Sequence, residues 1–256
     1  MEEMCGRPRS VRMFGNGCDG SGVERSVRQV SRHLGRVFEQ AGARMPLDIE
    51  ALDAAGLGTM DAIARDGARA WLSTVGHIDE AVFRHSLMVA GVMSSLLTML
   101  RVRRDQASLL VQGALLHDIG KVRIDPRILD KPGPLDADEM AIMRTHTQHG
   151  EAIAQAAGLG STICAMIRSH HEHLDGSGYP DGLRRGRISN AVRALTVCDI
   201  FSALVEPRSY KPALSPETAF ATMRLREAHL DRELLAMLHV AFDRPVAAAA
   251  EPAAAG

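Results

Sequence analysis

The chain has 256 residues, 46% of them hydrophobic, and is therefore long enough to bury a sizeable core within one large domain. Its formal net charge of −1 leaves no basic excess, so the composition gives no reason to expect nucleic acid or an anionic membrane surface as a partner. The sequence also contains no apolar run that approaches the roughly 18 residues required to span a bilayer. We therefore expect no nucleic acid and no membrane among its partners.

The four cysteines form no CxxC pair, and the first residues, "MEEMCGRPRS", lack the apolar core of a signal peptide. These two features predict a reduced protein in the cytoplasm.

Helical periodicity dominates the chain. The apolar positions are rich in Ala, Leu and Met, and only 4% of residues are aromatic, which favours helices over strands. We predict an all-α fold, with a first helix from about Val23 to Ala41 and a second from about Pro46 to Val75. Residues 1–76 form a short helical region of unknown role in this prediction, and its first 20 residues are expected to be mobile. The Ala-rich residues 246–256 are expected to be a disordered tail.

The next two predicted helices place polar residues on apolar faces. In "HIDEAVFRHSLMVAGVMSSLLTML" the apolar residues recur at helical spacing, and His85 falls within their face. In "SLLVQGALLHDIGKV" an apolar face leads to His117 and Asp118, and Gly120 is the expected helix terminator. An imidazole and a His-Asp pair are therefore expected to point into the core.

Three later segments repeat this arrangement. The segment "LDADEMAIMRTHTQHGEAI" opens with a capping-box variant and brings His146 to an inner face. A helix starting near Ser161 places His170 and His171 at the end of an apolar stripe. In "ISNAVRALTVCDIFSAL" the carboxylate of Asp199 lies in the middle of a buried face, where an isolated charge would be costly.

Each of these residues has a simpler interpretation as a hydrogen-bonded core histidine, a helix cap or half of an ion pair. Five inward histidines and two inward aspartates cannot all satisfy one another in a small core, whereas one or two cations would satisfy them. Imidazole and carboxylate ligands without thiolate suit Fe, Mn, Zn, Ni or Co and argue against a structural zinc site. The candidate metal ligands are His85, His117, Asp118, His146, His170, His171 and Asp199.

These motifs match a known family. "LLHDIGK" together with "HHEHLDGSGYP" resembles the HD-GYP domains, a branch of the HD metal-dependent phosphohydrolases. The resemblance runs from about His77 to Phe242 and also includes "KPGPL" at 131–135 and "RSYKPA" at 208–213. It implies an HD-type helical bundle over residues 77–245 that encloses a metal centre and hydrolyses cyclic di-GMP, a bacterial second messenger.

The same resemblance implies that all seven candidates are metal ligands and that Asp118 bridges two ions. Trinuclear members of the family have a glutamate four residues before the position of His85, where this chain has Ala81. The adjacent Glu80 would be rotated by about 100° on a helix. We therefore predict a binuclear site for two divalent ions, with Fe or Mn first and Zn, Ni and Co as alternatives.

Further residues receive roles by resemblance. Asp118 and Lys121 are the expected catalytic residues, and Lys121 is placed to donate to a non-bridging phosphate oxygen. Its simpler interpretation is a solvent-facing cation at a helix end. Arg208, Lys211 and Tyr210 are the expected contacts to the substrate phosphates, although "PRSYK" by itself is only a basic loop.

The glycine-rich block suggests three more roles. Tyr179 would stack on a guanine or contact a partner protein, or else the block is a rigid structural lid. Glu172 and Asp175 would orient ligand histidines from behind. His149 and His173 are not expected to be ligands.

Two functions from different classes follow. The first is a phosphodiesterase that opens cyclic di-GMP to pGpG and then yields GMP, or accepts a mixed cyclic dinucleotide. The alternative is a weakly active or inactive module that senses the nucleotide or docks on a diguanylate cyclase through its GYP surface. A homodimer stays open in both cases.

Overall fold

The computed structural model describes residues 21–78, 81–207, 212–225 and 228–243, without the side chains at positions 81 and 82. Within these ranges the secondary structure is helical, and the β pairing is an isolated bridge between Asp175 and Arg184. The all-α prediction is confirmed. None of the helices in these ranges is both long and apolar enough to cross a membrane.

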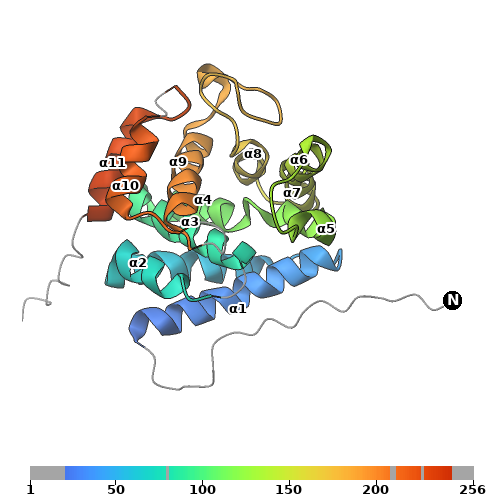
Figure 1. Ribbon diagram of the computed structural model, residues 1–256. Coiled ribbons are helices and arrows are strands. Elements are labelled where there is room, and N and C mark those ends of the chain that lie inside the picture. Colours follow the sequence, from blue (N-terminus) through green and yellow to red (C-terminus); the bar gives the residue numbers. More distant parts are fainter. Residues whose placement is uncertain (1–20, 79–80, 208–211, 226–227, 244–256) are drawn as a thin grey trace, which may run out of the picture.

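The first two helices form the base of the molecule (Figure 1). Helix α1 spans Gly22–Gly42 and begins with a capping box, and α2 spans Ile49–Val75 behind the N-cap Asp48. Both predicted helices are therefore present. Helix α2 is interrupted at Gly67, whose φ of 80° is accessible to glycine at little cost.

The base shares its hydrophobic core with the helices above it. The indole of Trp71 on α2 packs against α3, Ala81–Met99, and donates a hydrogen bond of 2.8 Å to the carbonyl of Leu87. A Cβ atom at Gly91 would lie 2.3 Å from this indole, so only glycine allows the contact. Helices α1 and α2 thus belong to the same buried cluster as α3.

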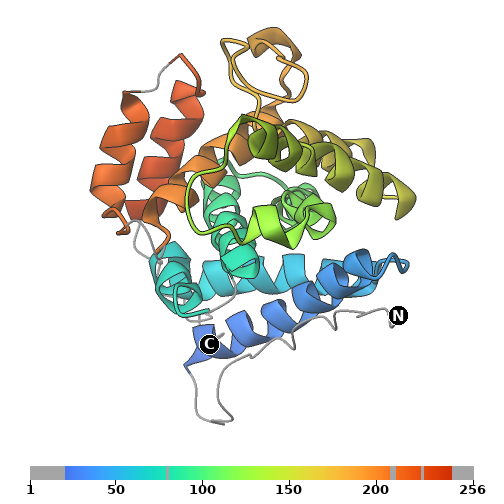
Figure 2. The ribbon, with the colours of Figure 1, turned by 45° about the vertical axis from the view of Figure 1, so that its right-hand side comes forward.

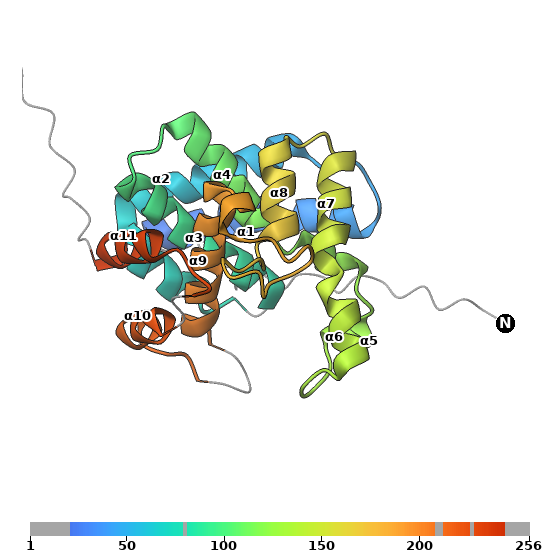
Figure 3. The same cartoon turned by 90° about the horizontal axis from the view of Figure 1, so that it is seen from above.

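Later helices pack around α3. The elements after α3 are α4 Arg104–Leu116, η1 Ile119–Arg123, α5 Pro126–Leu129, α6 Ala137–Arg144, α7 His146–Ala156, α8 Ser161–Ser169, η2 Arg185–Arg187, α9 Asn190–Val205, α10 Pro216–Arg224 and α11 Arg232–Asp243. Of these, α4, α9 and α11 pack against α3. Seen from above, α9 crosses the middle, with α10 and α11 on one side of it and α7 and α8 on the other (Figure 3).

Gly120 has a different role from the one expected. Helix α4 ends at Leu116, and Gly120 lies inside the short helix η1 that follows. A Cβ atom built on Gly120 would lie 1.8 Å from the carbonyl oxygen of His146. Gly120 therefore does not terminate the helix. It lets the backbone of η1 lie directly against α7. This contact brings the HD pair, His117 and Asp118, next to His146.

Candidate metal centre

All seven predicted ligands meet at one buried place between α3, α7 and α9 and the carboxyl ends of α4 and α8. They form two groups, and within each group one ligand atom per residue lies within 4.8 Å of the others. The first group consists of Asp118, His146, His170 and His171, and the second of His85, His117 and Asp199.

The backbone sets the tautomer of three of these histidines. The Nδ1 atoms of His117, His146 and His170 each lie 2.8 Å from the carbonyl oxygen three residues earlier. A carbonyl oxygen only accepts hydrogen bonds, so each Nδ1 carries the proton and each neutral ring presents an Nε2 lone pair. His117 and His170 directly follow α4 and α8, and His146 follows the end of α6 by two residues, so all three bond to carbonyls in a last helical turn, where intrahelical partners are lacking.

The Nε2 atoms face one another and the carboxylate of Asp118. Asp118 Oδ1 lies 3.3 Å from His146 Nε2 and 3.9 Å from His170 Nε2, and Oδ2 lies 3.4 Å from His117 Nε2. The Nε2 atoms of His146 and His170 are 3.4 Å apart, although neither carries a proton in this tautomer.

Two of these buried atoms have no hydrogen-bond partner at all, namely His117 Nε2 and Asp118 Oδ1. Unpaired polar atoms inside a protein are costly. Lone pairs that converge without a proton between them are the arrangement that a cation satisfies. The donor set therefore fits divalent metal ions.

The pKa values put these groups in the forms that bind metal. Burial lowers the pKa of His146, pushes that of His170 well below its usual range and lowers that of His171 to about 3. Burial alone would raise the pKa of Asp118, but the adjacent charge of Lys121 is the largest of the interactions that reverse this and hold the pKa well below its usual range. At neutral pH His146, His170 and His171 are therefore neutral and Asp118 is ionised, which are the forms that bind metal.

His85 differs from the other histidines because carboxylates contact both of its nitrogens. Its Nε2 lies 2.8 Å from Asp199 Oδ1, and its Nδ1 lies 3.3 Å from Glu206 Oε2. This second contact does not count as a hydrogen bond, but it is close enough for charge attraction. Burial lowers the pKa of His85, and Asp199 and Glu206 together outweigh burial and raise it to about 9. Hydrogen bonding to His85 likewise outweighs burial at Asp199 and keeps the pKa of that carboxyl low.

Glu206 was not among the predicted site residues. It is buried immediately after α9, and its carboxylate also pairs with Arg84, at 3.1 Å between Nε and Oε1. No periodic pattern singles out this position, because Glu206 lies beyond the helix end and its partner His85 is 121 residues away in sequence.

His171 and Tyr179 form the partly open side of the site. Their rings are 4.7 Å apart, and His171 Nδ1 lies 3.9 Å from Asp199 Oδ2. The guanidinium of Arg144 lies 4.9 Å from the centre of the Tyr179 ring. Arg144 is exposed and was also missed by the sequence analysis, because its partner on the glycine-rich block is 35 residues away. Lys121 lies close by, with Nζ 2.5 Å from Asp118 Oδ2.

Glu172 and Asp175 lie close to the ligand histidines in sequence but are bonded elsewhere. The buried carboxylate of Glu172 accepts backbone hydrogen bonds from Asp181 and Leu183, at 2.7 and 2.8 Å. Asp175 accepts two hydrogen bonds from Ser177. Neither carboxylate is hydrogen-bonded to a predicted ligand histidine within the described contacts, since backbone carbonyls already take the Nδ1 protons of three of them. Glu172 instead fastens the GYP loop, residues 171–183.

Several expectations fall outside the described residues. These are the mobility expected of residues 1–20, the disordered tail expected at 246–256, the three predicted substrate contacts Arg208, Tyr210 and Lys211, the neighbour Glu80 and the side chain of Ala81.

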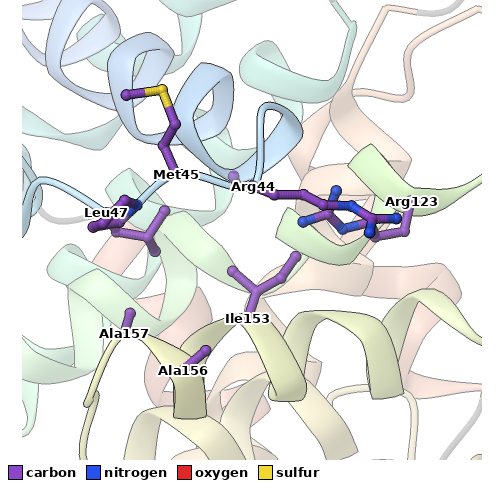
Figure 4. Close-up of a pocket in the computed structure, with 9 residues that line it drawn as sticks. Arg44, Met45, Leu47, Arg123, Ile153, Ala156 and Ala157 are labelled. Carbon is purple, nitrogen blue, oxygen red and sulfur yellow. The ribbon is translucent and has the colours of Figure 1, made fainter.

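A cavity of about 430 Å³ lies between the α1–α2 connection, η1 and α7 (Figure 4). Its walls include Arg44, Met45, Leu47, Arg123 and Ile153, and none of the predicted site residues that the structure describes lines it. The chemistry expected of this chain is therefore placed at the histidine clusters and not in this cavity.

Comparisons with known proteins agree with this assignment. The family model described as "HD domain" matches residues 75–234, more than half of the chain. A solved protein from Bdellovibrio bacteriovorus, described as HDG"Y"P, superimposes with a TM-score of 0.67 over 87% of this chain and 73% of its own, at 18% identity. This likeness concerns the fold.

Two curated relatives are more similar in sequence. A 3'3'-cGAMP-specific phosphodiesterase of Vibrio cholerae is 42% identical over 112 residues, which are 44% of this chain and 24% of the relative. A cyclic di-GMP phosphodiesterase of Pseudomonas aeruginosa is 33% identical over 157 residues, 61% of this chain and 38% of the relative. The chain thus spans well under half the length of these relatives.

The matched segment contains the HD pair, the other five clustered ligands and the GYP block, and the resemblance to HD-GYP domains is confirmed. This chain belongs to the HD domain family.

Proposed function

We propose that this chain is a metal-dependent phosphodiesterase that hydrolyses cyclic di-GMP to pGpG, with GMP as a further product, in bacterial second-messenger signalling. The observation that carries the proposal is the buried convergence of three Nε2 lone pairs on the carboxylate of Asp118, whose Oδ1 has no hydrogen-bond partner. The names of the relatives from Pseudomonas aeruginosa and Vibrio cholerae support the substrate class.

The two groups of side chains would hold two divalent ions. Asp118, His146, His170 and His171 would bind one, and His85, His117 and Asp199 the other. Nitrogen and oxygen donors without thiolate favour Fe or Mn, and Zn, Ni and Co are also compatible. When bound, such ions activate the attacking water and offset the charge that develops on the phosphodiester.

The protein's own cations would position the substrate. Lys121 lies beside Asp118 with a quarter of its side chain exposed, so its ammonium group can donate to a non-bridging phosphate oxygen. Arg144 lies over Tyr179 at the open side of the site, and its guanidinium suits the second phosphate of a cyclic dinucleotide. The predicted contacts from Arg208, Lys211 and Tyr210 would add to these.

A second candidate substrate is the mixed dinucleotide 3'3'-cGAMP. The name of the Vibrio cholerae relative, which is 42% identical over the matched segment, supports it. Both dinucleotides present the same phosphodiester to the site, so they would differ only in contacts to one base.

The proposal is tested with the full chain, purified anaerobically and loaded with Mn²⁺ or Fe²⁺. Metal content is measured, and each dinucleotide is then incubated with the protein while pGpG, mixed linear products and GMP are followed. We expect two ions per chain and turnover that is lost in the Asp118→Ala variant. The His149→Ala variant is the control, because His149 is an exposed histidine one turn along α7 from His146.

The proposal would be contradicted if the native chain held two ions but turned over neither dinucleotide, and if the Asp118→Ala variant bound the two ions equally well. That outcome would favour the alternative of a nucleotide sensor or a partner of diguanylate cyclases. Three ions per chain would contradict the binuclear site argued from Ala81.

We also propose that residues 77–245 form the catalytic unit, with α1 and α2 as its structural base. The first of these helices packs on the second, and the second buries Trp71 against α3. The cytoplasmic location and the homodimer stay predictions.

A further inference from the structure

A third group of metal-binding side chains lies outside the centre described above. His173, Asp175 and His229 offer one ligand atom each, and these atoms lie within 4.8 Å of one another. The first two residues belong to the GYP loop, and His229 belongs to the connection between α10 and α11, which lies beside that loop (Figure 2).

The two segments are joined next to this group. The backbone N–H of Leu174 donates a hydrogen bond of 3.0 Å to the carbonyl oxygen of His229. The imidazoles of His173 and His229 are stacked with centres 4.8 Å apart and planes 3° apart. His229 Nε2 lies 3.4 Å from Asp175 Oδ2.

Ser177 orders the donor atoms. Its hydroxyl lies 2.7 Å from Asp175 Oδ1, and its backbone N–H donates to the same oxygen at 3.0 Å. This leaves Asp175 Oδ2 directed toward His229. Because the hydroxyl proton is given to Asp175, the Ser177 oxygen accepts from His173 Nδ1, at 3.1 Å. In this tautomer Nε2 is the lone-pair atom of the His173 ring.

We propose that His173, Asp175 and His229 form a separate site for a first-row divalent transition metal of the zinc class. Two imidazoles and one carboxylate suit such an ion, and water fills its remaining positions. Zinc ligands lie about 2.0–2.2 Å from the metal, so the donor atoms must come closer together than 4.8 Å. The side chains of Asp175 and His229 are more than a third exposed and can turn into place without disturbing the core.

A metal ion at this site would affect the GYP loop. The GYP loop begins at the ligand His171 and carries Tyr179, which packs on His171. An ion that ties His173 and Asp175 to His229 would restrain this loop against the α10–α11 connection. The site is argued from its own geometry and does not depend on the proposed phosphodiesterase activity.

The test is site-resolved chemical modification of histidines. The full chain is first loaded with Mn²⁺, then treated with diethyl pyrocarbonate with and without Zn²⁺, and the labelled peptides are quantified by mass spectrometry. We expect Zn²⁺ to protect His173 and His229 and to leave His33 on α1 unprotected. In the His229→Ala variant, protection of His173 should require at least about tenfold more Zn²⁺.

Two further variants keep the test decisive if His229→Ala folds poorly. His229→Cys retains a donor atom and should restore protection of His173, whereas His229→Gln should not. His33→Ala is the matched control and should behave as the native chain. Failure of Zn²⁺ to protect His173 in the native chain, or equal protection in the His229→Gln variant, would overturn the proposal. Protection of His171 with accompanying loss of Mn²⁺ and unchanged labelling of His173 would also overturn it.

Discussion

At the scale of single residues, three ligand histidines of the metal centre are oriented by hydrogen bonds from their Nδ1 atoms to backbone carbonyls outside it. His117, His146 and His170 each donate from Nδ1 to a helix-end carbonyl, which fixes both the tautomer and the ring orientation. Burial keeps His146 and His170 neutral by opposing their protonation. The same backbone that ends α4, α6 and α8 thus aims three lone pairs at Asp118.

Glu206 is the residue through which the second group can be tested. The Glu206→Gln substitution removes the carboxylate beside His85 Nδ1 and the counter-charge of the largely buried Arg84. Breaking such a pair costs about 3–5 kcal/mol of unfolding free energy. We also expect the ion at His85, His117 and Asp199 to bind about 10- to 100-fold more weakly.

Chemical denaturation and metal titration check these two effects. Glu217→Gln is the matched control, because its ion pair with Arg69 is exposed on both sides and such pairs contribute at most about 1 kcal/mol. If Glu206→Gln loses stability but retains both ions with native affinity, Glu206 supports the fold and does not position His85.

At the scale of elements, the centre depends on how closely η1 approaches α7. The backbone of Gly120 lies against the carbonyl of His146 and the amide of Gly150, so no side chain fits between the two elements. This contact holds the HD pair next to His146. A similar approach occurs at Gly178, where a Cβ atom would lie 2.4 Å from the carbonyl oxygen of His171.

The Gly120→Ala substitution should therefore push η1 away from α7. Overpacking of this kind costs about 1–3 kcal/mol, and here it also separates Asp118 from His146. We expect a lower midpoint of thermal unfolding and loss of the ion bound by the first group, measured on the same preparation. Gly186→Ala is the control, since nothing lies within 4 Å of a Cβ atom at that exposed position. Native metal content in Gly120→Ala would show that the close approach is dispensable.

The elements also explain which parts of the site could be predicted from sequence. His85 and Asp199 lie on apolar helix faces, so helical periodicity alone directs them inward. The extents of α1 and α2 were predictable for the same reason. Glu206 and Arg144 contact the site through partners that are distant in sequence. The bonds of Glu172 depend on the path of a loop, and loop paths have no periodic pattern.

At the scale of the whole molecule, the buried titrating groups couple folding to pH in opposite directions. His85 is protonated more readily in the folded protein than in the unfolded chain, because Asp199 and Glu206 raise its pKa from 6.5 to about 9. His171 is protonated less readily, because burial lowers its pKa from 6.5 to about 3. The metal-free site therefore contains one histidine with a raised pKa, His85, and three whose protonation is opposed by burial, His146, His170 and His171.

We predict that the unfolding free energy of the metal-free protein is highest near pH 6.5. Above that pH the folded state alone retains the His85 proton, so its stabilisation is lost as pH rises toward 9. Below pH 6.5, His171 becomes protonated in the unfolded chain but stays neutral in the folded protein. The unfolding free energy therefore falls as pH drops toward 3. Each group contributes a slope of at most about 1.4 kcal/mol per pH unit.

Urea denaturation in the presence of a chelator, repeated between pH 5 and 9, measures this profile directly. The His85→Gln variant should lose the decline on the alkaline side and keep the decline on the acid side. The His33→Ala variant changes a histidine outside all three groups of metal-binding side chains and should follow the native profile. A native profile that stays flat from pH 6.5 to 9 would show that Asp199 and Glu206 do not hold a proton on His85, and the charge balance inferred for the metal-free protein would then be wrong.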